Sequence, residues 1–127
     1  MSVDHEGAGK NVLIADDDDH VRAVIEELLS GAGYRPIAAE DGAEALDWLS
    51  RVPIHLLIVD ILMPHIDGLN LIKWVRRRKE WATIPIIVLS AYANLDRYRN
   101  LSVDALQAKP FDLATLLETV DRLITSR

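Results

Sequence analysis

Short apolar segments alternate with amphipathic ones along this chain, and this alternation constrains the fold more than any other feature. The apolar runs occupy residues 12–15, 34–39, 54–59, 84–89 and 105–108. Runs of this length that are rich in Val and Ile are typical of strands buried on both faces. Segments with helical periodicity separate them. The pattern predicts an α/β, doubly wound domain: a five-stranded parallel sheet with helices on both faces.

Proline positions predict the strand order. Pro36 lies inside the second run, where it is tolerated mainly at a sheet edge. The fifth run is short and half polar, which suits the other edge, and Pro85 stands at the start of the fourth run. An order of 2-1-3-4-5 satisfies these observations. In such a sheet the order reverses between strands 1 and 3, and ligands bind beyond their carboxyl ends.

The first two helices carry recognisable end signals. We expect Asp19 to cap the first helix, because aspartate is a favoured N-cap residue, and Gly31 and Gly33 to end it. Asp41 is expected to cap the second helix, with Glu44 three residues later as in a capping box.

The later helices are predicted from the same periodicity. The third should start at Asp67 and end in the basic run 76–79, which we expect to be solvated. A fourth, at 94–101, is short and polar, and a fifth begins at Asp112. The apolar residues expected on buried helix faces are Val21, Val24, Ile25, Leu28, Leu29, Ala43, Leu46, Leu49, Leu69, Ile72, Val75, Leu113, Leu116, Leu117, Val120, Leu123 and Ile124.

Composition narrows the class of protein. The 127 residues suit one domain, expected at 11–127 after a loose lead-in at 1–10 that does not resemble a signal peptide. The absence of cysteine excludes disulfides, thiolate metal sites and a cysteine nucleophile. No apolar run is long enough to span a membrane, so we expect a cytoplasmic protein without membrane insertion. A net charge of −6 disfavours direct binding to nucleic acid.

Polar and charged residues follow four of the five predicted strands. Residues 16–19 are all aspartate, and Asp60, Ser90 and Lys109 end strands 3, 4 and 5. Because the carboxyl ends of parallel strands share one edge, these groups should converge at the point where the strand order reverses. Crowded carboxylates take up protons or bind a cation, and oxygen ligands with room for water suit Mg²⁺. With a lysine and a hydroxyl beside a free carboxylate, the group has the parts needed for phosphoryl transfer.

Four segments resemble the signature segments of the response regulator receiver domain of two-component, or phosphorelay, signalling systems. They read VLIADDDDHVR, LIVDILMPHIDGL, IIVLSAYA and AKPF, in the order that the family shows, and the similarity extends from about residue 11 to 125. The resemblance implies a flavodoxin-like three-layer sandwich, in agreement with the predicted sheet.

The resemblance also implies the roles of individual residues in a magnesium site. Asp60 matches the phosphoacceptor aspartate. Asp16 and Asp17 match the acidic pair that holds Mg²⁺, and Leu62, two residues after the acceptor, would offer its backbone carbonyl to the metal.

Two further residues match the family's catalytic groups. Ser90 matches the hydroxyl that turns toward the phosphoryl group, and Lys109 matches the lysine that pairs with a phosphoryl oxygen. The Lys109–Pro110 bond would be cis.

The chain departs from the family pattern at two positions. Leu106 stands where an aromatic residue usually lies, three residues before Lys109, so transmission to the output surface is expected to be altered. Ser102 replaces a frequent glycine, which would change the preceding turn. Tyr92, two residues after Ser90, is expected to shield the aspartyl phosphate from water.

Three alternatives were weighed against this interpretation. A haloacid-dehalogenase-type phosphatase would use Asp16 and Asp18, but it leaves Asp60 without a role and needs a longer chain. A flavodoxin-like redox protein would place a flavin phosphate against four aspartates, which would repel it. A receiver-like binding module that signals without phosphorylation stays open.

The function expected from the sequence is therefore a signalling switch rather than a metabolic enzyme, with only self-phosphorylation and weak autophosphatase chemistry. The phosphodonor partner would be a sensor histidine kinase or a phosphotransfer protein. Output would pass to a downstream target protein, or to an effector domain if the chain was cut from a longer one, through a surface formed by residues 94–101, strand 105–108 and the last helix.

Overall fold

A computed structural model describes residues 8–63, 67–91 and 101–125. Tyr92, most of the helix expected at 94–101 and Pro64 lie outside the described residues. Within the described residues, no helix combines the length and the hydropathy needed to cross a bilayer.

Five parallel strands form one sheet in the order β2-β1-β3-β4-β5, which confirms the predicted fold and topology. The strands are β1 (Asn11–Ala15), β2 (Arg35–Ala39), β3 (Leu56–Asp60), β4 (Ile86–Ala91) and β5 (Ala105–Lys109). Pro36 lies in the edge strand β2, where its missing N–H costs no ladder bond on the open side. Pro85 immediately precedes β4.

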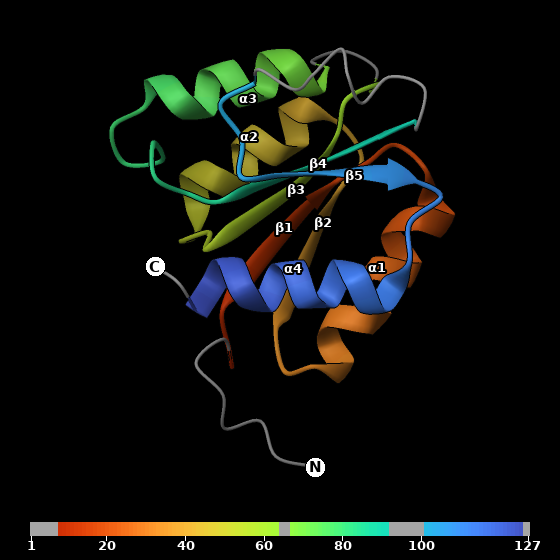
Figure 1. The fold of residues 1–127 in the computed structure, drawn as a ribbon. Helices are drawn as coiled ribbons and strands as arrows, with labels where there is room; N and C mark the ends of the chain where they lie inside the picture. The colour runs from red at the N-terminus through yellow and green to blue at the C-terminus, as the bar shows by residue number, and fades with distance from the viewer. Residues whose placement is uncertain (1–7, 64–66, 92–100, 126–127) are drawn as a thin grey trace.

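Helices cover both faces of the sheet (Figure 1). They are α1 (Asp19–Gly31), α2 (Gly42–Arg51), α3 (Gly68–Arg77) and α4 (Leu113–Thr125). Packing against α2 and α3 are Leu13, Leu57 and Val88, whereas their strand neighbours Ile14 and Ile58 pack against α1 and α4. This alternation makes two apolar layers, as expected for strands buried on both sides.

Three of the four helix starts agree with the prediction, and the start of α1 differs from it. Asp41 and Asp67 accept the backbone N–H of the residue three positions later, and Asp112 accepts that of Thr115. The expectation that Asp19 caps α1 was wrong: Asp18 is the N-cap, because its extended backbone lets its carboxylate accept the N–H groups two and three residues on.

Two of the expected buried positions were also wrong. Ala43 is exposed, because the inward face of α2 is formed by Gly42, Ala45 and Leu49. Leu113 is 39% exposed at the first position of α4, whereas Leu116 and the residues that follow in its stripe are buried.

The basic run at the end of α3 is only partly solvated. Residues 77–79 are exposed, as predicted, but Arg76 lies half-buried. Its guanidinium donates to the carbonyls of Ala82, Ile84 and Ser102 at 3.0, 2.7 and 2.9 Å. It also pairs with Asp104 at 3.3 Å, and that carboxylate accepts the N–H of Ile86 at 2.8 Å. The expectation of a fully solvated run was therefore wrong at Arg76, which ties α3 to the beginnings of β4 and β5.

Removal of this connection should destabilise the domain. Arg76→Ala removes the guanidinium that three carbonyls and the half-buried Asp104 carboxylate share, so we expect the free energy of unfolding to fall by about 2–3 kcal/mol. Arg76→Lys keeps the charge but not the several N–H donors of the guanidinium, so it should lower the free energy of unfolding by about half as much. Urea titration measures both, and the neighbouring exposed Arg77→Ala should change stability by less than about 0.5 kcal/mol. Equal stability of the Arg76 and Arg77 variants would contradict the assignment.

Candidate functional site

Three carboxylates converge at the carboxyl edge of the sheet, where the strand order reverses. Asp16 and Asp17 directly follow β1, and Asp60 ends β3. One oxygen from each of the three lies within 4.8 Å of the others. Asp16 and Asp60 are buried, whereas Asp17 is exposed at the rim. The donor set fits a hard divalent cation: three carboxylate oxygens on one side and open solvent on the other leave positions for water, as Mg²⁺ prefers.

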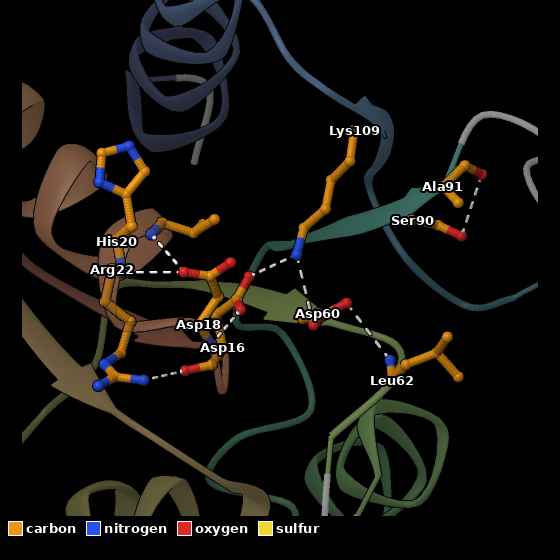
Figure 2. Close-up of polar contacts among 10 residues, drawn as sticks. Asp16, Asp18, His20, Arg22, Asp60, Leu62, Ser90, Ala91 and Lys109 are labelled. Carbon is orange, nitrogen blue, oxygen red and sulfur yellow. Dashed lines mark hydrogen bonds and ion pairs between the residues drawn. The ribbon is translucent and has the colours of Figure 1, made fainter.

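Lys109 extends from the end of β5 into this acidic cluster (Figure 2). Its ammonium donates to Asp16 at 2.9 Å and lies 3.4 Å from Asp60. Burial disfavours the charged amine, but the hydrogen bond and charges of the two aspartates outweigh it and raise the pKa of Lys109 above its usual value. The lysine therefore stays protonated beside the carboxylates. The Lys109–Pro110 peptide bond is cis, as expected from the sequence.

The fold makes the carboxyl group of Asp60 hard to ionise. Burial and the nearby charge of Asp16 raise its pKa to about 6, although Lys109 and the backbone N–H of Leu62 act in the opposite direction. That N–H donates to Asp60 at 3.3 Å. A partly desolvated carboxylate is a poorly solvated anion, and such a group is a better nucleophile than one surrounded by water.

The remaining predicted residues lie beside the cluster. Ser90 is buried in β4, and its hydroxyl contacts the carbonyl of Ala91 at 3.5 Å, so it is turned away from Asp60 (Figure 2). Leu62 is 67% exposed and engages Asp60 through its N–H. A metal-binding role for its carbonyl stays a prediction.

Asp18 and Arg22 fix the loop after β1, a role that the sequence did not predict for either residue. The N–H of Asp18 donates to the Asp16 carboxylate at 2.9 Å. Arg22 donates to the Asp16 carbonyl at 2.6 Å and pairs with Asp19. The sequence signal was present, because Asp19 and Arg22 are three apart in the first turn of a helix. These contacts hold Asp16 in place against repulsion from its neighbours.

Gly68 explains why glycine follows Asp67 at the start of α3. Its N–H donates to the carbonyl of Ile61 at 2.9 Å, which brings its Cα against the end of β3. A Cβ at this position would lie 2.4 Å from the carbonyl oxygen of Asp60 and 2.7 Å from the Cα of Ile61. Glycine is thus required for the backbone that carries Asp60 to lie against α3.

Known proteins that are similar to this chain are response regulators or receiver domains. A family model described as the response regulator receiver domain matches residues 12–121. Response regulator RR06 of Streptococcus pneumoniae is 35% identical over 117 residues, covering 90% of this chain and 52% of RR06. The chain thus spans about half the length of this curated relative.

Solved structures show the same similarity. A putative response regulator from Chloroflexus aurantiacus superposes with a TM-score of 0.87 at 34% identity, covering 92% of this chain and 98% of that one. The receiver domain of sensor histidine kinase PA1611 from Pseudomonas aeruginosa, with a magnesium ion in its active site cleft, has a TM-score of 0.84 at 29% identity and covers 93% of this chain and 99% of its own.

Ionisation of Asp60 should destabilise the metal-free fold. The pKa of Asp60 is about 6 in the folded protein and near 3.9 in an unfolded chain. The folded state therefore binds more protons between about pH 4 and 6, and the free energy of unfolding falls as pH rises through that window. In EDTA, Asp60→Asn should raise stability by about 2 kcal/mol at neutral pH and by close to zero at about pH 4. Urea titration at both pH values tests this, with the exposed Asp47→Asn as control; a pH-independent effect of Asp60→Asn would refute it.

A methyl group at Gly68 should displace the backbone that carries Asp60. Gly68→Ala must displace backbone at Asp60 and Ile61, so we expect a loss of about 2–4 kcal/mol in thermal or urea unfolding. Gly31→Ala is the matched control, because a Cβ there meets nothing within 4 Å. It should be neutral or stabilising by up to about 1 kcal/mol. Similar losses in both variants would argue against the close approach of α3 to β3.

Proposed function

This chain belongs to the response regulator receiver domain family, and on that premise we propose that it accepts a phosphoryl group on Asp60 from a phosphohistidine donor of a two-component system. The observation that carries the proposal is the convergence of Asp16, Asp17 and Asp60 within 4.8 Å, with the Lys109 ammonium 3.4 Å from Asp60. A switch of protein contacts, rather than turnover of a metabolite, would be its output.

Phosphoryl transfer would use each residue in a distinct way. An Asp60 oxygen attacks phosphorus in line, the O–P bond forms, and the P–N bond to the donor imidazole breaks as that nitrogen regains a proton. Lys109 pairs with a phosphoryl oxygen and balances the added charge. Ser90, which contacts a neighbouring carbonyl in this state, would rotate to donate its hydroxyl to the phosphoryl group.

The acidic cluster fits Mg²⁺ as the cofactor. Asp16, Asp17 and Asp60 would hold it through carboxylate oxygens, and Leu62 through its carbonyl. The chemistry that the ion supplies at such a site is neutralisation of phosphoryl oxygen charge. The contacts of Asp18 and Arg22 with Asp16 support the site by keeping that carboxylate in one position.

Phosphorylation by a small donor tests the assignment directly. Incubation with acetyl phosphate and Mg²⁺ should add the mass of one phosphoryl group to the wild type, measured on the intact protein. Asp60→Asn should abolish the addition, Lys109→Ala should slow it by about 10- to 100-fold, and Ser90→Ala should still be phosphorylated. An unmodified wild type would favour the alternative of a receiver-like module that signals without phosphorylation, and modification of Asp60→Asn would reject Asp60 as acceptor.

An apolar cavity beside the site suits a protein phosphodonor. It has a volume of about 340 Å³ and adjoins the acidic cluster through Lys109. Its walls are His20, Val21, Val24, Lys109, Pro110, Phe111 and Leu113. Leu113, whose exposure was unexpected from the sequence, offers an apolar side chain at this cavity, which supports contact with an apolar surface of the donor.

A substitution in this cavity should separate protein donors from small donors. Leu113→Asp should reduce phosphotransfer from an autophosphorylated histidine kinase by about 10-fold or more, because a carboxylate cannot pack against an apolar donor surface. Its phosphorylation by acetyl phosphate should be within about 2-fold of wild type. The kinase is the one that transfers fastest to the wild type in a panel of the host's kinases. Trp74→Asp, at an exposed apolar residue of α3, is the control, and equal loss in both variants would remove the docking role of Leu113.

A further inference from the structure

A second cavity lies between α2 and α3, away from the phosphoacceptor. It has a volume of about 430 Å³ and is lined by Leu46, Ser50, Trp74, Arg77, Arg78 and Trp81. Both helices run antiparallel to the strands, so the helix ends that carry Ser50 and Arg77 lie toward the amino edge of the sheet, opposite Asp60 (Figure 1). We refer to this cavity as the α2–α3 groove.

Aromatic rings form the floor of the groove. Trp74 is 46% exposed, although it lies in the middle of a helix that buries Leu71, Ile72 and Val75. Trp81 is half-buried and packs against the core on one side. The guanidinium of Arg78 stands 4.6 Å from the centroid of the Trp81 ring, a cation–π arrangement. Trp and Arg are the residues most often found to dominate the affinity of protein interfaces.

The charge of the groove is opposite to that of the whole chain. Its lining contains two arginines and no acidic residue, and Lys73 and Lys79 are exposed on either side of them in the sequence. Glu80 offsets part of this charge by pairing with Arg78 at 3.2 Å. The chain nevertheless has a net charge of −6, so this local excess of cations selects an acidic partner.

From these observations we propose that the α2–α3 groove binds an acidic, amphipathic peptide segment of a partner protein. Apolar side chains of the segment would fill the hollow against Trp74 and Leu46, and its carboxylates would pair with Arg77 and Arg78. Two neighbouring helices with an apolar hollow between them suit an amphipathic helix. A nucleic acid is disfavoured, because its binding requires many phosphate contacts and the chain as a whole carries a net charge of −6.

The groove would give the domain an anchoring function separate from its phosphorylation. The proposed phosphoacceptor site is at the other edge of the sheet, and no lining residue of the groove takes part in it. Binding of the segment should therefore occur in the unphosphorylated protein. Failure of this proposal would leave the proposed phosphotransfer intact, and the reverse also holds.

Fluorescence anisotropy with a defined probe tests the groove. The probe is a fluorescein-labelled 16-residue peptide with Leu and Phe spaced three and four residues apart and Glu and Ala elsewhere. We expect a Kd of about 10–100 µM with the unphosphorylated full chain. Trp74→Ala and Arg77→Glu should each weaken binding about 10-fold or more. Arg51→Glu, an exposed charge reversal on α2 outside the lining, should bind as wild type does.

Control probes separate the groove from general electrostatic attraction. A scrambled peptide of equal composition should bind at least about 5-fold more weakly, and a peptide with Lys for Glu should not bind below about 1 mM. Phosphorylation of each variant by acetyl phosphate should match the wild type, which shows that the variants are folded.

Four outcomes of the binding experiments would overturn the proposal. They are no binding of the acidic probe below about 1 mM, equal binding of the scrambled peptide, unchanged affinity in both groove variants, and tighter binding of a labelled single-stranded DNA 20-mer than of the peptide. A dimer in sedimentation experiments that Trp74→Ala dissociates would also overturn it, since the groove would then hold a second copy of this chain.

Discussion

Mutual repulsion of carboxylates is the constraint around which this domain is arranged. Asp16 and Asp60 are buried within reach of each other, and such a pair persists only if one carboxyl group takes up a proton or a nearby cation compensates the charge. The Lys109 ammonium supplies one from the far end of the chain, which links the carboxyl ends of β1, β3 and β5 through charge. The parallel sheet in turn makes this meeting possible, because it brings all three strand ends to one edge.

Much of this arrangement could be predicted from the sequence. The apolar runs predicted the strands, because burial on both faces leaves a continuous apolar segment in the sequence. Pro36 helped to predict the strand order, because a residue without a backbone N–H is tolerated mainly in an edge strand. The convergence of Asp16, Asp17, Asp60 and Lys109 followed from topology alone. Local side-chain geometry was predicted less well. Asp18 and Asp19 are chemically identical, and which one caps α1 depends on the backbone angle at the loop.

Long-range contacts account for the other differences between the predicted and the observed structure. Arg76 looked like its three basic neighbours, but only it faces the carbonyls at 82, 84 and 102, which no local pattern identifies. Leu113 obeys the helical period yet lies at the first turn of α4, where the sheet no longer covers it. Leu106, at the position where the family usually has an aromatic residue, is half-buried and packs against the α2–α3 side of the core.

The fastening of β5 has a mechanical consequence. Asp104 fixes the beginning of this edge strand to β4 and to α3, and every residue of the strand, Lys109 included, is paired with β4. Because β4 holds this strand along its whole length, a force on the Lys109 ammonium is taken up first by the flexible lysine side chain and only then by the strand as a whole.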